Sequence, residues 1–133
     1  MEPIVMSEIL IDTDILIDFS RGITSTAQYL AQASTTSQLS ISSITQMELI
    51  VGCQDKQALR TIDRFLTRFQ IILLTPEITQ QGIDLLHEYK LSHGLLIPDS
   101  LIAATALTIG IPLLTRNQRD FRFIPNLTLL PPP

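Results

Sequence analysis

The segment Ile9–Asp14, with the sequence ILIDTD, places Asp12 and Asp14 directly after a short apolar run. An unbroken run of Ile and Leu is typical of a strand that is buried on both faces, as in a parallel sheet. Charge at the end of such a strand is costly unless a cation or hydrogen-bond donors compensate it. The segment therefore predicts an α/β fold with a polar site at the carboxyl end of its first strand.

Short apolar runs and helical patterns alternate along the rest of the chain. We expect strands at residues 8–11, 38–41, 71–74, 111–114 and 127–130. We expect helices at residues 14–19, 24–33, 44–52, 56–68, 76–92 and 98–110, with a turn or short helix at 117–121. This rhythm indicates a parallel sheet with helices on both faces. Residues 1–133 are expected to form one domain, with a core at about 9–130 and a tail at 131–133.

The composition restricts the classes of protein that fit. Hydrophobic residues make up 45% of the chain and charged residues 17%, which predicts a large core and argues against disorder. No apolar stretch reaches the ~18 residues of a membrane span, no signal peptide is evident, and Cys53 is the only cysteine. We therefore expect a cytoplasmic protein without disulfides. The net charge of −4 argues against a nucleic-acid binder, unless bound metal neutralises some of the acids.

Glu48 lies on an apolar helical face. Ile44, Met47, Glu48 and Val51 share that face at helical spacing, so the carboxylate is expected to point toward the core or a cleft at its edge. The segment Thr45–Glu48 also matches a capping box, in which Glu48 would only hydrogen-bond the start of a helix. Both interpretations of Glu48 stay open at this point.

Asp99 heads the buried side of an Ala-rich helix, because Ile102, Ala103, Ala106 and Leu107 follow it on one face. Small residues on that face let the helix approach the sheet, which would bring the acid to the strand ends. The alternative is a first-turn acid that the helix dipole favours.

The loop after the expected fourth strand contains Asp120, with Thr115 and Asn117 as further oxygen ligands or donors. It also fits an ordinary polar loop in which Thr115 is a cap, just as Asp12 and Asp14 fit turn and N-cap roles. Position favours a site, because ligands bind outside the carboxyl ends of parallel strands. Oxygen ligands without Cys or His select hard ions such as Mg²⁺ or Mn²⁺.

Four motifs together resemble a known family. They are IDTDILIDF at residues 11–19, TQMELIVG at 45–52, PDSLIAATA at 98–106 and LLTRNQRDF at 113–121. In this order and spacing they are similar to PIN domains, and more narrowly to the VapC-type toxins of bacterial and archaeal toxin–antitoxin pairs. The resemblance covers about residues 9–130 and implies a three-layer α/β/α sandwich around a parallel sheet of about five strands.

The resemblance also implies a Mg²⁺- or Mn²⁺-dependent endoribonuclease whose products carry a 5′-phosphate and a 3′-hydroxyl. The acids that match its catalytic and metal-binding quartet are Asp12, Glu48, Asp99 and Asp120. Thr115 and Asn117 match the polar residues beside the fourth acid. Many relatives have Asn or Ser at the position of Asp14, so its supporting role, as a ligand or only as extra charge, stays open.

We hypothesise that metal-activated water hydrolyses the phosphodiester bond, with Asp12 and Asp99 as the principal metal ligands. Arg116 and Arg119 flank the fourth acid and, with Arg21, are candidates for contacts to RNA phosphates. The implied partners are RNA, a cognate antitoxin and a second copy of the chain in a homodimer, with no membrane.

Two other classes of function fit part of the pattern. Asp12 and Asp14 match the Asp-x-Asp of haloacid dehalogenase-type phosphohydrolases, but that chemistry also needs a well-placed Lys, and neither Lys56 nor Lys90 follows a strand. A non-catalytic module would use the acids only to hold a structural ion or the antitoxin. The acidic net charge mildly favours such a module, and the complete quartet argues against it.

Overall fold

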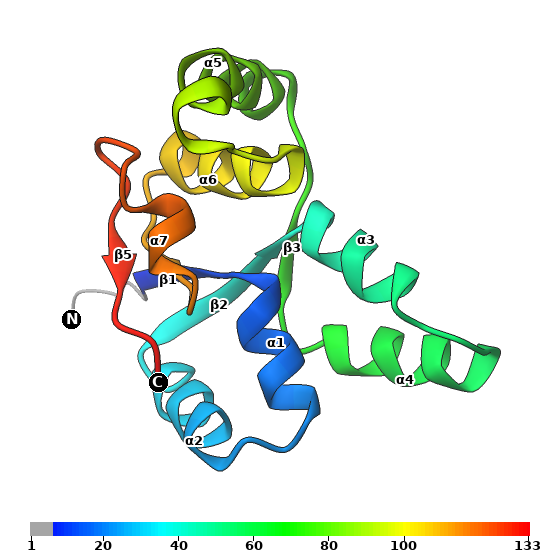
Figure 1. The fold of residues 1–133 in the computed structure, drawn as a ribbon. Helices are drawn as coiled ribbons and strands as arrows, with labels where there is room; N and C mark the ends of the chain where they lie inside the picture. Colours follow the sequence, from blue (N-terminus) through cyan, green and yellow to red (C-terminus); the bar gives the residue numbers. More distant parts are fainter. Residues whose placement is uncertain (1–6) are drawn as a thin grey trace.

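The computed structural model describes residues 7–133, which form a five-stranded sheet in the order β3-β2-β1-β4-β5 with every neighbouring pair parallel (Figure 1). The strands are β1 (Ser7–Ile11), β2 (Ser37–Ser42), β3 (Gln70–Ile72), β4 (Leu113–Leu114) and β5 (Leu129–Leu130). The helices are α1 (Thr13–Ser20), α2 (Thr24–Ala33), α3 (Ser43–Val51), α4 (Lys56–Leu66), α5 (Pro76–His93), α6 (Ile97–Ile109) and α7 (Gln118–Phe121). The predicted α/β class with a parallel sheet is confirmed.

Every expected strand and helix is present, and the differences lie at their ends. The strand expected at 111–114 is only Leu113–Leu114, because the Ile111 N–H donates to Ala106 O at the end of α6 and Pro112 has no N–H. The helix expected at 56–68 ends at Leu66, after which the chain turns into β3.

Neighbouring residues of β1 face opposite sides of the sheet. Leu10 packs in a core with residues of α5, α6 and α7, whereas Ile9 and Ile11 pack in a second core with residues of α1, α2 and α4. Figure 1 shows α5 and α6 on one side of the strands and α1 and α2 on the other. The apolar run of β1 is therefore buried on both faces, in a three-layer α/β/α arrangement.

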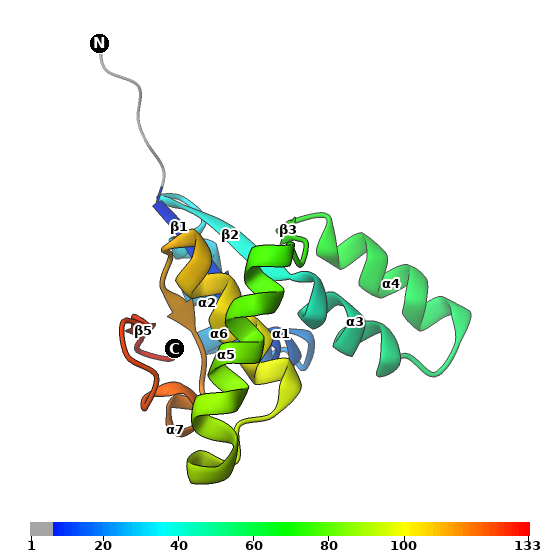
Figure 2. The ribbon, with the colours of Figure 1, turned by 90° about the horizontal axis from the view of Figure 1, so that it is seen from above.

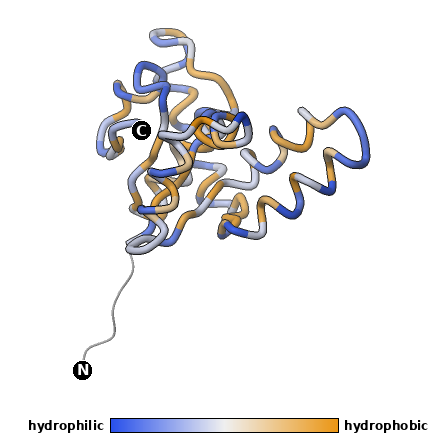
Figure 3. Tube along the Cα trace, turned by 90° about the horizontal axis from the view of Figure 1, so that it is seen from below, coloured by the Kyte–Doolittle hydropathy of each residue, from blue (hydrophilic) through white to orange (hydrophobic). Residues whose placement is uncertain are grey.

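Helices α3 and α4 extend away from the β3 edge as an arm (Figure 2). Hydrophobic and hydrophilic residues alternate along this arm (Figure 3), as in helices with one solvated face. Within residues 7–133, no helix is both long enough and apolar enough to span a membrane.

Two glycines set the position of α6 against α5. A Cβ on Gly82 would lie 2.9 Å from Leu101 Cδ2, which is too close for any side chain at this point of α5 unless Leu101 moves. Gly94 ends α5 in the left-handed conformation (φ 69°), where glycine carries no steric penalty, and the chain turns there toward α6. Together they place the first turn of α6, and with it Asp99.

Candidate active site

Asp12 lies at the carboxyl end of β1, beside the end of β4. Ile11 pairs with Leu114 in the sheet, so the residues that follow them, Asp12 and Thr115, are neighbours. The Thr115 hydroxyl donates to Asp12 Oδ2 (2.7 Å). Asp12 Oδ1 accepts from the Thr13 N–H (2.8 Å), so Asp12 is also the N-cap of α1. The side chain is buried and held through both oxygens.

Asp14 points at the loop that follows β4. Its Oδ2 accepts from the backbone N–H groups of Arg116 (3.0 Å) and Asn117 (3.2 Å). Its Oδ1 is buried and has no hydrogen-bond partner among residues 7–133. The N-cap role considered for Asp14 is wrong, because Asp12 takes that position and Asp14 lies in the first turn. A buried carboxylate oxygen without a donor is a place where a cation would be stabilising.

Glu48 reaches the site from α3. The capping box considered for Thr45–Glu48 is wrong, because α3 begins at Ser43 and its cap is the Ser42 hydroxyl, which accepts from the Ile44 N–H (3.1 Å). Glu48 Oε1 instead accepts from the Thr13 hydroxyl (2.8 Å), next to Asp12 in the chain. Glu48 is exposed, so it lies at the edge of the site rather than in the core.

Asp99 and Asp120 line one cavity of about 370 Å³, together with the loop between α5 and α6. Asp99 lies in the first turn of α6, while Ile102, Ala103 and Ala106 on the same helix are buried, as expected from their spacing. Asp120 lies on α7 and is exposed. The acids of the predicted quartet thus approach from four elements: the end of β1, α3, α6 and α7.

The carboxylates of the site repel one another and lose hydration. Burial, followed by the charge of Asp14, raises the pKa of Asp12 from 3.8 to about 7. Burial, followed by the charges of Asp120, Glu48 and Asp14, raises the pKa of Asp99 from 3.8 to about 6. Burial also raises the pKa of Asp14. Asp99 also raises the pKa of Asp12, so Asp99 couples electrostatically to all of the other four acids.

The chemistry of these side chains fits a hard divalent cation. All of them offer oxygen, and Asp14 Oδ1 is buried with no donor among the described residues. Among residues 7–133, no three or more His, Cys, Asp or Glu side chains stand close enough together to form a ready-made metal cage. Mg²⁺ commonly keeps several waters and takes only one or two protein carboxylates directly. The arrangement therefore fits an ion held partly through water.

The three arginines expected to contact RNA have different surroundings. The Arg116 guanidinium donates to Asp18 Oδ2 and to Thr26 Oγ1 (3.1 Å), so it joins the loop after β4 to α1 and α2. Arg119 lines the cavity of Asp99 and Asp120. Arg21 is exposed at the end of α1. Contacts of all three with RNA stay predictions.

His93 and Arg122 also line this cavity, and the sequence pattern did not single them out for a site. In the sequence, His93 has no metal-ligand spacing to any of the acids. Phe123, 30 residues further along the chain, lines the cavity beside it. Only the packing of α7 near the end of α5 brings the two rings together.

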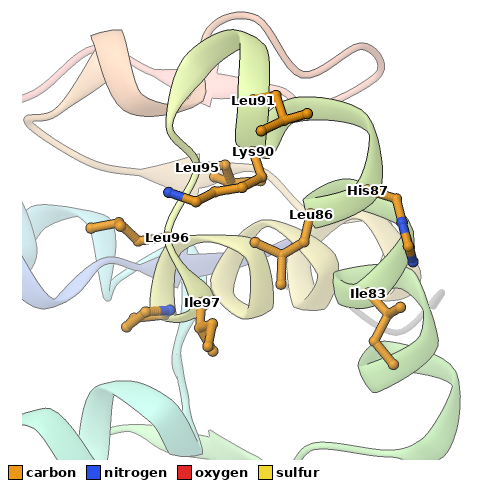
Figure 4. Close-up of a pocket in the computed structure, with 9 residues that line it drawn as sticks. Ile83, Leu86, His87, Lys90, Leu91, Leu95, Leu96 and Ile97 are labelled. Atoms are coloured by element: carbon orange, nitrogen blue, oxygen red, sulfur yellow. The ribbon is translucent and has the colours of Figure 1, made fainter.

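A second cavity, of about 810 Å³, lies along α5 and the start of α6 (Figure 4). It is lined mainly by aliphatic side chains, among them Leu86, Leu91, Leu96 and Ile97, and contains no carboxylate. Leu95 and Leu96 line this groove and the acidic cavity, so the loop between α5 and α6 separates the two.

Comparison with known proteins agrees with the geometry of the site. The family model of the PIN domain matches residues 9–126, which span β1 through the loop before β5. The chain belongs to the PIN domain family. The predicted family is confirmed, and the four acids, Asp14, Thr115 and Asn117 all lie within the matched part of this PIN domain.

The relatives of this PIN domain extend over nearly its whole length. Ribonuclease VapC19 of Mycobacterium tuberculosis is 34% identical over 120 residues, which are 89% of this chain and 95% of the relative. The structure of VapBC2 from Rickettsia felis bound to a DNA fragment from their promoter has a chain with 30% identity and a TM-score of 0.80, covering 92% of this chain and 97% of that one. A toxin–antitoxin complex from Klebsiella pneumoniae has a chain with 35% identity and a TM-score of 0.77, covering 93% and 97%. The narrower resemblance to VapC-type proteins is thereby confirmed.

Proposed function

We propose that this PIN domain protein is a Mg²⁺- or Mn²⁺-dependent endoribonuclease that acts as the toxin of a type II toxin–antitoxin system. The observation that carries the proposal is the place of Asp99, whose charge couples to those of Asp12, Asp14, Glu48 and Asp120 at the carboxyl end of the sheet. Repelling, half-dehydrated carboxylates are costly to a fold unless they hold a cation. A ribonuclease name among the full-length relatives supports RNA as the substrate.

The residues of the site divide the work of hydrolysis between them. Asp12 and Asp99 would hold the ion, and Asp14 would support it through Oδ1, which has no donor among residues 7–133. When bound, the ion supplies a water of lowered pKa and positive charge toward the phosphoryl oxygens. Asp120 and Glu48, the two exposed acids, would take up the proton that hydrolysis releases and return it to solvent.

The bond that forms joins the water oxygen to phosphorus, and the bond that breaks joins phosphorus to the 3′ oxygen. The products are therefore a 5′-phosphate and a 3′-hydroxyl. Thr115 keeps Asp12 in place through its hydrogen bond, and the N–H groups of Arg116 and Asn117 keep Asp14 in place.

RNA cleavage with and without metal tests the proposal. We expect the purified protein to cleave single-stranded RNA with Mg²⁺ or Mn²⁺ and to stop in EDTA. Asp99→Asn should lose activity by at least ~10²-fold, the scale for losing one preorganised electrostatic group. The control is Asp63→Asn, an exposed acid on the outer part of α4. Cleavage by Asp99→Asn at the wild-type rate would contradict the proposal.

The two rival functions have less support. In a haloacid dehalogenase-type reaction Asp12 would be the nucleophile, but both of its oxygens accept hydrogen bonds from Thr115 and Thr13. Lys56 begins α4 and Lys90 lines the apolar groove, away from the acids. A purely metal- or antitoxin-binding module would bind Mn²⁺ without cleaving RNA, which the same assay detects.

We further propose an antitoxin partner, a homodimer and action in the cytoplasm. The two solved toxin–antitoxin complexes support the antitoxin. The groove of Figure 4 offers exposed apolar surface for a second copy, with Leu91 98% exposed. Light scattering after size exclusion tests the dimer: the wild type should run as a dimer and Leu91→Asp as a monomer.

A further inference from the structure

An aromatic cluster lies at the wall of the acidic cavity. The His93 imidazole and the Phe123 ring are stacked, with centroids 4.1 Å apart and planes 16° from parallel. Tyr89, one turn before His93 on α5, contacts both rings, with centroids 5.1 Å from Phe123 and 5.8 Å from His93. His93 is exposed and Phe123 half-buried, so the His93 ring of the stack is accessible to solvent.

The same cavity carries the groups that a nucleotide needs on its other sides. His93 and Phe123 share the cavity with two acids of the proposed active site and two arginines: Asp99, Asp120, Arg119 and Arg122. Its volume of about 370 Å³ lies within the range of small-ligand pockets. Because these rings line the same cavity as two acids of the proposed phosphate-cleaving site, they are placed to hold the base of the cleaved nucleotide or of its neighbour.

We propose that the His93–Phe123 stack is a nucleobase subsite of the ribonuclease. One base of a single-stranded RNA lies against the stack, Arg119 and Arg122 contact the phosphate beside it, and the scissile phosphate reaches Asp99 and Asp120. Every base has a π face, so the stack favours unpaired bases over duplex and discriminates little between base types. The inference rests on the proposed ribonuclease function. It adds a binding place for a base of the RNA, whereas the acids act on the phosphate.

Charge complementarity favours RNA over a protein segment at this place. A base can stack on the rings, while its phosphate can accept hydrogen bonds from the arginines and would bind the ion proposed at the acids. An apolar side chain from a protein partner would cover the rings but would offer no acceptor oxygen to Arg119 or Arg122. An antitoxin segment at the stack is therefore the competing outcome that the experiment must detect.

The test removes the ring of His93 and compares it with the second histidine of α5. His87→Ala is the matched control, because His87 is also exposed on α5 but lines the apolar groove (Figure 4). We expect His93→Ala to weaken binding of a fluorescent single-stranded RNA 10-mer in EDTA by about 10-fold, the scale of one base–aromatic stack. His93→Tyr should restore most of the binding, and His87→Ala should bind as the wild type does. Thermal melts establish that each variant is folded.

An abasic substrate separates stacking from a general loss of binding. After the cleavage position is mapped on one RNA, abasic sites are placed on either side of it. One abasic RNA should raise the KM of the wild type about 10-fold with little change in kcat, and should raise the KM of His93→Ala no further. Additive effects of the variant and the abasic site would overturn the subsite.

The remaining outcomes are distinct. Unchanged RNA binding by His93→Ala, with cleavage intact, overturns the subsite and leaves the ribonuclease function standing. Unchanged RNA binding together with weakened inhibition by the antitoxin assigns the stack to the partner and also overturns the subsite. RNA binding that depends on His93, without any cleavage in Mg²⁺ or Mn²⁺, supports the subsite and contradicts the nuclease mechanism.

Discussion

The acidic site has an inner pair, Asp12 and Asp14, and an outer pair, Asp99 and Asp120, and the two pairs are held differently. The inner pair accepts hydrogen bonds from Thr13, from Thr115 and from the backbone of the loop after β4. No side-chain hydrogen bond to either member of the outer pair occurs within residues 7–133. The sheet and its loops therefore fix one half of the site before any ligand binds. The other half lacks such donors among residues 7–133, so an ion or a substrate would set the orientation of its carboxylates.

The largest effect on RNA cleavage is expected when the negative charge of Asp12, in the inner pair, is removed. Asp12→Asn should lower kcat for RNA cleavage by at least ~10²-fold, because it removes a charged ligand of the ion. It should also raise the Tm in EDTA, because Asn can still cap α1 and the desolvated charge at Asp12 is gone. Asp120→Asn should lose activity without that gain in Tm, since Asp120 is exposed. Equal changes in Tm for the two variants would contradict the claim that the inner pair is dehydrated in the fold and Asp120 is not.

The next largest effect on activity is expected when the hydrogen bond that Thr115 donates to Asp12 is removed. Thr115 is fully buried, and its hydroxyl donates to Asp12 and accepts from the Asn117 N–H (3.0 Å). Thr115→Val keeps the volume and removes both bonds, so we expect about 10- to 100-fold less activity and about 1–3 kcal/mol less stability. Urea denaturation and cleavage kinetics measure the two losses. Thr128→Val, at an exposed threonine, is the control. Full activity in Thr115→Val would mean that Asp12 needs no fixed orientation.

The sequence predicted the fold well because its main signals are local. The run Ile9–Ile11 and the helices expected at 76–92 and 98–110 each depend on a few neighbouring residues, and each lies within a residue or two of its expected place. The ends of β4 and the cap of α3 were missed because more than one cap or strand end fits the same short segment. Ser42 and Thr45 both resemble N-caps, and only the register of β2 selects Ser42.

The candidate site was predicted as residue types and not as contacts. Asp12, Glu48, Asp99 and Asp120 stand out because an acid beside apolar sequence is unusual. The hydrogen bonds that hold Asp14 come from backbone N–H groups about 100 residues away, and backbone groups carry no sequence signal. The stack of His93 on Phe123 depends in the same way on how α5 and α7 meet in space. These contacts depend on how distant segments pack together, so sequence motifs alone cannot predict them.

Stability against pH measures the cost of the charges in both pairs. The folded protein keeps protons that the unfolded chain releases, on Asp99 between pH 3.8 and about 6 and on Asp12 between pH 3.8 and about 7. The favourable contribution is complete below 3.8 and is lost as the pH rises through about 6 for Asp99 and about 7 for Asp12. In EDTA we expect the protein to be less stable at pH 8 than at pH 5, by on the order of 1–3 kcal/mol, with Mn²⁺ restoring more at pH 8.

Thermal melts at the two pH values, with and without Mn²⁺, check this expectation. The double variant Asp12→Asn/Asp99→Asn is the control, because it removes the two groups whose raised pKa values define the window. Its Tm should depend less on pH and hardly at all on Mn²⁺. A wild-type protein that is more stable at pH 8 than at pH 5 in EDTA would show that the acids are not dehydrated as the fold implies.

The smallest expected effect is a difference in RNA binding between variants of Arg116, beside the inner pair, and Arg119, beside the outer pair. Arg116 is tied to Asp18 and Thr26 behind the inner pair, whereas Arg119 lines the cavity of the outer pair. If RNA enters on the outer side, Arg119→Ala should weaken RNA binding a few-fold and reduce the slope of log K against log salt by about 1. Arg116→Ala should reduce that slope by less than Arg119→Ala does, because its guanidinium is already paired with Asp18, and it should cost at most about 1 kcal/mol of stability, as for an ion pair near the surface. Anisotropy titrations of a labelled single-stranded RNA over a range of salt concentrations measure both slopes. A lower slope in Arg116→Ala, with no change in Arg119→Ala, would place the RNA on the side of the fixed pair and reverse the comparison.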